Sequence, residues 1–240
     1  MEERKISICT PDDLDHRLWR YIDFLKFVDL LQRRALWFSR LDQLGDPHEG
    51  SLTKPTAKAL GDFHSRSGLE LARRYGDWER ICVSCWHMSD YESAAMWALY
   101  SKESGIAVCS RISRRQHSFP PEVTGGSWGI VGSHVHYKDY ETDDMAILEH
   151  SSVVLTAAPF MCKRKSFEHE REYRLSLNLD SDDGNLKGKH VPALLESLIE
   201  KVVVSPLAQE WVTQVVRNEI RASGLNIDVE QSDLHNPLLK

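Results

Sequence analysis

The sequence predicts an α+β fold, in which residues 1–240 form a single mixed-sheet domain with flanking helices. Two observations favour this fold class. Hydrophobic residues make up 41% of the 240 residues, enough for one sizeable core. Segments with the two-residue period of strands and the 3.6-residue period of helices also follow one another irregularly. We see no internal repeat, low-complexity tract or clear linker that would divide the chain.

The first predicted elements are a helix over residues 23–34 and a strand over residues 35–39. The helix has apolar residues at positions i, i+3, i+4 and i+7, so they share one face. The stretch LDQLGDPHEG then ends regular structure with Gly and Pro. Residues 54–79 form a polar stretch that permits a helix.

The central part of the chain alternates strands and helices. A strand is predicted at 81–88, and Ser89 or Asp90 would cap a helix at 91–101. The other predicted elements are strands at 106–109, 129–131 and 135–137, and a helix at 145–160.

The last part completes the sheet. In YRLSLNL, residues 173–179, apolar and polar side chains alternate as in a half-buried strand. A strand at 199–204, an amphipathic helix at 207–221 and a strand at 227–229 follow.

The composition narrows the class of protein. The net charge of −6 argues against a general nucleic-acid coat, because phosphate binding requires basic surface. No apolar run reaches the roughly 18 residues of a membrane span, and the N-terminus lacks an apolar signal core. Five scattered cysteines indicate reduced thiols. We therefore expect a cytoplasmic protein with no membrane partner.

One CxxC sequence, Cys82 to Cys85, lies in the predicted strand at 81–88. A structural zinc site needs four ligands, and no second pair stands at matching spacing. Buried strand thiols are favoured over a metal or redox site. His134 and His136 share a face of the strand predicted there, but no third metal ligand is evident.

The stretch KRKSFEHEREYRL, residues 163–175, places Glu168, Glu170 and Glu172 at every second position. Extending the strand backwards puts these carboxylates and Arg174 on one face, about 7 Å apart along the strand. One interpretation is a solvated outer face with weak surface ion pairs. The other is a strand lining a cleft, where carboxylates act as a base or stabilise a cationic transition state.

Three other segments are candidates for a functional site, and each of them also has two interpretations. Asp46-Pro47-His48-Glu49 is either a turn or the polar lip of a site. Trp97 and Tyr100 either pack in the core or stack on a base or nicotinamide ring. The basic run 163–165 either caps the preceding helix or binds a phosphate.

Three stretches together resemble the prokaryotic family called domain of unknown function 2971. They are LWRYIDF with ALWFSRLDQLGDPHEG, then CVSCWHMSDYESAAMWALYSKESGIAVCSR, then KRKSFEHEREYRL. The matching features are Arg20-Tyr21, Phe38-Ser39, the Asp-Pro segment, Met96-Trp97 with Tyr100, and the acidic pair before Arg174. The resemblance covers most of the chain to about residue 180. Two positions depart from the family pattern: Phe167 replaces a Trp and Gly45 an Asn.

The order of these features is also similar to ADP-ribosyltransferases of the R–S–E kind. In that resemblance Arg20 holds the NAD ribose or phosphate, and Ser39 supports the nicotinamide pocket. Glu172 binds the nicotinamide ribose and favours an oxocarbenium-like state, while Glu170 orients an acceptor. The usual Ser-Thr-Ser run is only Phe38-Ser39-Arg40 here.

The resemblances therefore imply an ADP-ribosyltransferase-like core that consumes NAD, as a transferase or an NAD glycohydrolase. The acceptor would be a protein or nucleic acid, and a role in bacterial defence or as a toxin would fit. The sequence does not predict the oligomeric state. The implied catalytic residues are Glu172 and Glu170, and the implied NAD contacts are Arg20, Tyr21, Ser39, Asp46, Trp97, Tyr100 and Arg174.

Two alternatives stay open from the residues. One is a non-catalytic module that binds a nucleotide or RNA through the Asp46–Glu49 lip and residues 163–174. The other is a nuclease whose carboxylates hold Mg²⁺. The candidate ligands for that metal are Asp46, Glu49, Glu170 and Glu172.

Overall fold

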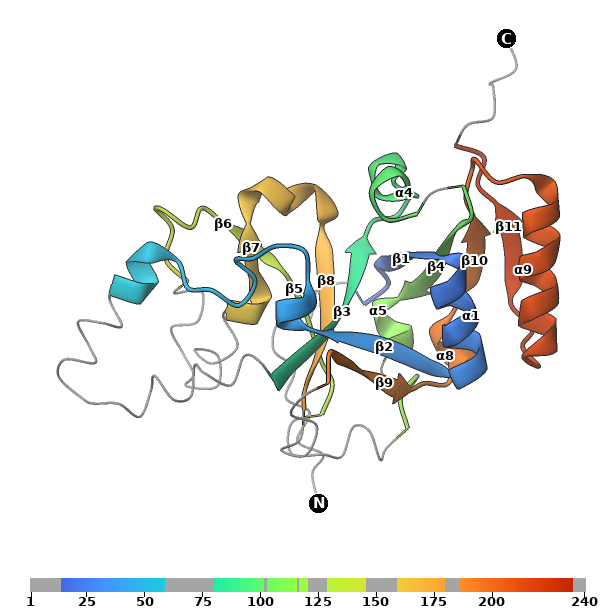
Figure 1. Ribbon diagram of the computed structural model, residues 1–240, viewed down its shortest axis with the longest axis horizontal. Coiled ribbons are helices and arrows are strands. Elements are labelled where there is room, and N and C mark those ends of the chain that lie inside the picture. Colours follow the sequence, from blue (N-terminus) through green and yellow to red (C-terminus); the bar gives the residue numbers. More distant parts are fainter. Residues whose placement is uncertain are drawn as a thin grey trace, which may run out of the picture. The chain divides into compact units, whose positions relative to one another are not determined.

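The computed structural model confirms the predicted α+β class, with a mixed sheet and flanking helices (Figure 1). It describes residues 14–58, 80–101, 103–115, 117–120, 129–145, 159–179 and 186–234. The chain divides into two compact units. The first unit contains the described residues within Phe38–Ser84 and Ser127–Lys189. The second contains those within Asp12–Trp37, Cys85–Gly126 and His190–Lys240. The single domain over 1–240 stays a prediction.

The strands of the second unit form a mixed sheet. Strand β4 pairs antiparallel with β1 on one side and with β10 on the other, and β10 pairs parallel with β11. β1 also pairs antiparallel with the end of β3, through Trp19 and His87. The bounds are β1 Arg17–Asp23, β3 Ile81–Met88, β4 Gly105–Arg111, β10 Lys201–Val204 and β11 Asp228–Gln231.

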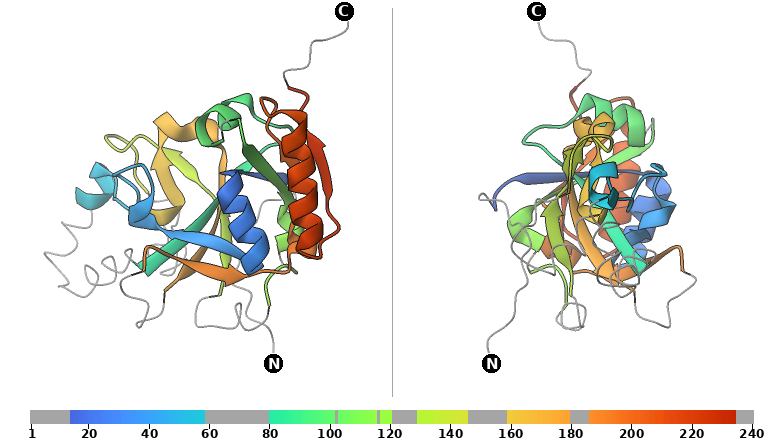
Figure 2. Two further views of the ribbon diagram at one scale, coloured as in Figure 1. Left: turned by 45° about the vertical axis from the view of Figure 1, so that its right-hand side comes forward. Right: turned by 90° about the vertical axis from the view of Figure 1, so that its left-hand side faces the viewer.

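Helices α1 (Phe24–Arg33) and α9 (Glu210–Ala222) pack against this sheet and against each other. The left view of Figure 2 shows α9 running along β11. The Asp23 side chain accepts a hydrogen bond from Lys26 N and caps α1, which ends at Arg34 in the left-handed conformation. The predicted helix at 23–34 is therefore confirmed. Two short helices, α5 (Ile112–Arg115) and α8 (Leu195–Leu198), also belong to this unit.

Helix α4 (Ala94–Tyr100) begins three residues later than the sequence predicts. Its cap is the Ser93 side chain, which accepts a hydrogen bond from Met96 N. Ser89 instead accepts a hydrogen bond from Tyr91 N within the preceding turn. The prediction of the cap was wrong because several polar residues in this stretch can bond to nearby backbone N–H groups, and the sequence does not rank them.

The first unit contains the paired strands β5 (Val131–His134) and β8 (Glu172–Asn178), which run antiparallel. Two more strands, β6 (His136–Lys138) and β7 (Cys162–Arg164), form a separate parallel pair. Three strands contribute residues to both units: β2 (Ala35–Arg40), β3 and β9 (Gly188–Pro192). In the first unit β2 pairs with β3 through Ser39 and Val83. A short 3₁₀ helix, η1 (Leu41–Gln43), follows β2.

The backward extension of the β8 strand was wrong. Residues Lys165–Glu170 form a 3₁₀ helix, η3, and Arg171 adopts the left-handed conformation with φ 42° before β8 begins. Strand alternation therefore starts at Glu172. The predicted strand at 135–137 corresponds to β6 within one residue, but His134 and His136 do not share a strand, because β5 ends at His134 and β6 starts at His136.

Most of the other predicted strands and helices that fall in the described residues are present in the structure. The strands at 35–39, 81–88, 106–109, 199–204 and 227–229 and the helix at 207–221 are confirmed, within a few residues at their ends. Most of the helix-permissive stretch at 54–79, and most of the helix predicted at 145–160, lies outside the described residues. None of the described helices is long and apolar enough to cross a membrane.

Candidate functional site

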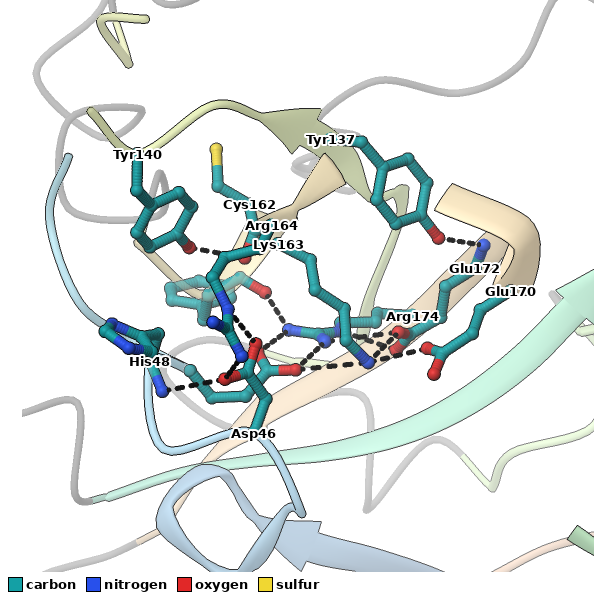
Figure 3. A network of polar contacts seen from close by, with 12 residues as sticks. Asp46, His48, Tyr137, Tyr140, Cys162, Lys163, Arg164, Glu170, Glu172 and Arg174 are labelled. Carbon is teal, nitrogen blue, oxygen red and sulfur yellow. Dashed lines mark hydrogen bonds and ion pairs between the residues drawn. The ribbon is translucent and has the colours of Figure 1, made fainter. Parts of the chain in front are cut away.

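Five ionisable side chains of the first unit meet in one buried group, which we call the charged cluster (Figure 3). Its guanidinium is fully buried, and the side chains of its two innermost carboxylates are 1% and 4% exposed. Burial of charge is costly unless each charge is paired and hydrogen-bonded. The members are Glu49, Lys163, Glu170, Glu172 and Arg174.

Four segments place these side chains, and Glu170 is the last residue of η3. Glu172 and Arg174 are two residues apart on β8, so strand alternation turns both to the same face. Lys163 is the middle residue of β7. Glu49 comes from the turn after η1, where Glu49 N donates to the carbonyl of Asp46 at 3.1 Å.

Arg174 lies between two carboxylates. Its two terminal nitrogens donate to the two oxygens of Glu49 at 2.9 and 2.8 Å. Its Nε donates to Glu172 Oε1 at 2.5 Å, and Nη2 reaches Glu172 Oε2 at 3.2 Å. A further bond runs to the carbonyl of Phe160 at 2.8 Å. Bidentate pairing of this kind fixes the planes of all three groups.

Lys163 contacts all three carboxylates of the cluster. Its Nζ lies 2.6 Å from Glu170, 3.3 Å from Glu49 and 3.4 Å from Glu172. Burial lowers the pKa of this ammonium, but the nearby carboxylates, Glu172 foremost, outweigh burial and raise the pKa above the ordinary lysine value. Lys163 is therefore held as a cation.

The left-handed residue Arg171 explains how both glutamates of the E-x-E pair reach one ammonium. It ends η3, and its backbone N–H bonds to the carbonyl of Glu168. This turn directs Glu170 back toward Lys163 while Glu172 starts the strand. A left-handed backbone costs a non-glycine residue about 1 kcal/mol or more. Such strain is often found at functional sites.

The charges of the cluster do not balance. Three carboxylates face one guanidinium and one ammonium, which leaves a formal charge of −1. Glu170 is the outermost carboxylate, with a side-chain exposure of 7% against 1% for Glu49 and 4% for Glu172. The excess negative charge would favour any positive charge that develops or binds beside it.

The ion pair between Asp46 and Arg164 has no net charge, and its carboxylate lies in the same turn as Glu49. Arg164 donates to both oxygens of Asp46, at 3.1 and 2.7 Å, and His48 N donates to Asp46 Oδ1. Burial raises the pKa of the Asp46 carboxyl, but the bonds from Arg164 and His48 outweigh it and lower the pKa below the ordinary value. Asp46 and Glu49 thus tie the Asp-Pro-His-Glu turn to β7 and β8, so this segment is both a turn and part of the site.

Two tyrosines support the cluster. The hydroxyl of Tyr137 accepts a hydrogen bond from Glu172 N at 2.8 Å, and that of Tyr140 donates to the carbonyl of Cys162 at 3.3 Å. Burial raises the pKa of both hydroxyls above the ordinary tyrosine value. Both tyrosines are therefore neutral at physiological pH.

The predicted NAD contacts fall in different units. Ser39, Asp46 and Arg174 belong to the first unit with the charged cluster, and Arg20, Tyr21, Trp97 and Tyr100 belong to the second. Arg20 and Tyr21 are neighbours on β1, so their side chains point to opposite faces of the sheet.

Arg20 is bonded within the second unit. It donates to the carbonyl of Trp37 at 3.0 Å, and its guanidinium lies 5.9 Å from the ring centre of Trp86. Burial lowers the pKa of Arg20 to about 10, while Cys85 opposes this by raising it. A group with this pKa still carries its charge at pH 7.

Tyr21 and Trp97 belong to the core. They are 7% and 4% exposed and pack edge to face, with ring centres 5.0 Å apart. The hydroxyl of Tyr21 accepts a bond from Ser93 N, and the indole of Trp97 donates to Glu92. Tyr100 is 47% exposed on the same helix as Trp97. Core packing thus describes the position of Trp97, while Tyr100 faces solvent.

The interpretation of residues 168–174 as a solvated face was wrong for Glu170, Glu172 and Arg174, which are buried. It holds for Glu168, which is exposed on η3. Sequence reasoning missed Lys163, which was interpreted as a helix cap or phosphate ligand although it follows a buried strand residue. The sequence signal that could have identified Lys163 is its short distance along the chain from Glu170 and Glu172, seven and nine residues away.

Metal ligation is not evident in the cluster. Among the described residues, no group of three or more His, Cys, Asp or Glu side chains is arranged to hold a metal ion. The carboxylates of the cluster are bonded to Lys163 and Arg174. The described cysteines, Cys82, Cys85, Cys109 and Cys162, are free thiols.

The fold and site define an α+β protein with a buried, negatively charged cluster of glutamate, lysine and arginine. Comparison with family models finds no match, so membership of the domain of unknown function 2971 family stays a prediction. A search of curated proteins also finds no match.

Solved structures similar to this chain include those of DarT from Thermus sp. 2.9. DarT in complex with ADP-ribosylated single-stranded DNA is 9% identical, with a TM-score of 0.43 and coverage of 95% of this chain and 98% of that one. DarT with NAD⁺ is 10% identical, with a TM-score of 0.41 and coverage of 93% and 98%. DarT with carba-NAD⁺ is also 10% identical, with a TM-score of 0.40 and coverage of 92% and 96%. TM-scores this low carry no argument about what this chain binds.

Proposed function

We propose that the protein breaks the bond between nicotinamide and ribose in NAD⁺, as an ADP-ribosyltransferase or an NAD glycohydrolase. The observation that supports this proposal is the convergence of Glu170 and Glu172 on Lys163 in a buried cluster with one excess negative charge. The sequence resemblance suggests the reaction, and the proposal does not rest on the likeness to DarT.

The reaction needs negative charge at a fixed position. As the bond between ribose C1′ and the ring nitrogen breaks, its electron pair goes to the nitrogen and nicotinamide leaves as a neutral molecule. Positive charge then builds on C1′ and the ring oxygen of the ribose. A nucleophile, either water or a group on an acceptor, bonds to C1′ and gives up its proton. A carboxylate already oriented beside C1′ stabilises this charge without reorganising.

Glu172 suits the role of the stabilising carboxylate. Arg174 and Lys163 bond to its oxygens and Tyr137 accepts from its backbone N–H, so both side chain and backbone are held. Glu170, the outermost carboxylate, suits the role of orienting the acceptor and taking its proton. For the nicotinamide pocket, the proposal keeps Ser39, which belongs to the same unit as the charged cluster.

The alternatives receive less support. A magnesium nuclease would require carboxylates that are open to the metal, whereas those of the cluster are bonded to Lys163 and Arg174. A simple nucleic-acid module would present a basic groove, and the cluster instead carries a net negative charge. The free thiols of the described cysteines suit a reducing compartment, so we also propose a cytoplasmic location.

The test is nicotinamide release from NAD⁺ by the purified protein, beside the variants Glu172→Gln and Glu168→Gln. Both substitutions remove one negative charge from the same stretch, but Glu168 is exposed and outside the cluster. We expect release by the wild type and Glu168→Gln, and a loss of at least about a hundredfold in Glu172→Gln. Thermal unfolding of each variant establishes that it is folded.

A second arm separates transfer from hydrolysis. NAD⁺ labelled in its adenosine part is incubated with the protein, with and without cell lysate. Label on protein or nucleic acid identifies a transferase and its acceptor class, whereas free ADP-ribose identifies a glycohydrolase. No nicotinamide release in either condition, by wild-type protein that is folded, would overturn the proposal.

A further inference from the structure

The hydroxyl of Tyr137 is a further polar group beside the charged cluster. Tyr137 is the half-buried middle residue of β6, and its oxygen accepts a hydrogen bond from Glu172 N at 2.8 Å. We propose that this hydroxyl donates its own proton to a hydroxyl group of the nicotinamide ribose and so determines part of the substrate specificity. The inference rests on the proposed function, which puts the ribose of NAD⁺ beside Glu172.

The pairing of β6 with β7 sets the position of Tyr137. The two strands run parallel, and Tyr137 stands directly opposite Lys163 in their register. Both side chains reach Glu172, Tyr137 at the backbone N–H and Lys163 at the carboxylate, 3.4 Å away (Figure 3). The Tyr137 hydroxyl is therefore fixed at the same residue whose carboxylate is proposed to stabilise the ribose.

The hydroxyl proton of Tyr137 is available to a ligand. A tyrosine hydroxyl both accepts and donates, whereas a backbone N–H and an ammonium only donate, so neither Glu172 N nor Lys163 Nζ can accept this proton. Among the residues that the structure describes, the Tyr137 hydroxyl makes one hydrogen bond, in which it is the acceptor. Tyr140 differs, because its hydroxyl donates to the carbonyl of Cys162 at 3.3 Å.

Tyr137 keeps its proton at physiological pH. Burial is the largest cause that raises the pKa of its hydroxyl above the ordinary tyrosine value, and the charges of Glu172 and Glu170 raise the pKa further. The hydrogen bond from Glu172 N and the charge of Lys163 act in the opposite direction but are outweighed. The site thus holds a neutral donor beside its carboxylates.

A ribose hydroxyl is a suitable acceptor for this donor. The proposed reaction places C1′ beside the Glu172 carboxylate, and the next two carbons of the ring, C2′ and C3′, carry the nearest hydroxyl groups. The ring oxygen is a poor acceptor, because positive charge builds on it as the bond to nicotinamide breaks. A site that forms a hydrogen bond with a substrate hydroxyl discriminates against an analogue that lacks it.

The experiment measures kcat/KM for nicotinamide release from three substrates. They are NAD⁺ and two analogues whose nicotinamide ribose lacks the 2′-hydroxyl or the 3′-hydroxyl. The proteins are the wild type, Tyr137→Phe and Tyr91→Phe. Tyr91 is 80% exposed and lies outside the charged cluster, so its variant controls for the loss of a tyrosine hydroxyl.

The substrate dependence separates recognition from a structural role. Tyr137→Phe loses the bond from Glu172 N as well as the proposed bond to the ribose. Loss of the first should lower kcat/KM by the same factor for all three substrates, whereas loss of the second matters only where the contacted hydroxyl is present. We therefore expect the ratio of wild type to Tyr137→Phe to be about fivefold to tenfold larger for NAD⁺ than for one analogue. The ratio for Tyr91→Phe should stay near one throughout.

The outcomes also separate this inference from the proposed function. An equal ratio for all three substrates overturns the inference, while release by the wild type still supports the function. A wild type that accelerates both analogues as much as NAD⁺, relative to their uncatalysed rates, also overturns it, and this comparison does not require the variant to fold. No release by the wild type from any substrate overturns the proposed function and the inference with it. Thermal unfolding shows whether Tyr137→Phe keeps its fold.

Discussion

Arg174 is fully buried and donates through Nε to Glu172 Oε1 at 2.5 Å, two residues away on the same strand face. This pair joins the first carboxylate of β8 to the turn that carries Glu49, because the same guanidinium also bonds to Glu49. The stability of the site should therefore depend on the balance of charge around Arg174.

Arg174→Gln should destabilise the protein strongly. It leaves three carboxylates facing Lys163 alone, and removing one partner of a buried ion pair typically costs about 3–5 kcal/mol. Adding Glu49→Gln to this variant should restore part of the loss, because the charge returns to that of the wild-type cluster. Chemical denaturation of wild type, both single variants and the double variant measures the coupling. A double variant no more stable than Arg174→Gln would contradict the charge balance.

The pair of Asp46 and Arg164 should give a pH-dependent contribution to stability. The pKa of Asp46 is lower in the folded protein than in the unfolded chain, so its contribution is present above the unfolded pKa, near 3.8. It is lost as the pH falls through the lower folded pKa. Asp46→Asn should therefore cost about 1–2 kcal/mol at pH 7, and the difference from wild type should shrink below about pH 4. Urea unfolding at pH 7, 5 and 3 checks this. A constant difference at all three values would exclude a charge effect.

Arg171→Gly should relieve backbone strain. Arg171 has φ 42°, a conformation that glycine adopts freely. We expect a gain in stability of up to about 1 kcal/mol, reduced by the larger entropy that glycine gives the unfolded chain. Arg171→Ala removes the guanidinium but keeps the β-carbon, so it should show no such gain. Thermal unfolding of the three proteins makes the comparison, and equal stability of the two variants would show that backbone conformation is not the cause.

The predicted single domain should unfold in one cooperative transition. The boundaries between the two compact units fall within β2, β3 and β9, so each unit contains only part of each of these strands. We expect the calorimetric and van't Hoff enthalpies of unfolding to agree and the near- and far-ultraviolet circular dichroism signals to change together. Two resolved transitions would show that the units fold as separate domains.

Local patterns in the sequence predicted most of the elements. The amphipathic face of α1, the apolar run of β3 and the alternation in β8 each depend on side chains within about ten residues, and the structure confirms them. The errors came where backbone conformation is decided by longer-range contacts. Residues 165–170 alternate like a strand but form a 3₁₀ helix, and their Glu170 bonds to Lys163 on another strand.

The sequence by itself determined the α+β class and the order of most elements, and it predicted a site that includes the Asp-Pro turn and the E-x-E pair. Only the tertiary structure decided that Lys163 and Arg174 neutralise two of three buried carboxylates, because pairing across elements has no local pattern. The tertiary structure also showed that two adjacent residues, both predicted as NAD contacts, face different environments. Arg20 and Tyr21 point to opposite faces of β1, since successive side chains of a strand alternate. Residues close in the chain need not share a site, and charges far apart in the chain meet when their burial requires a partner.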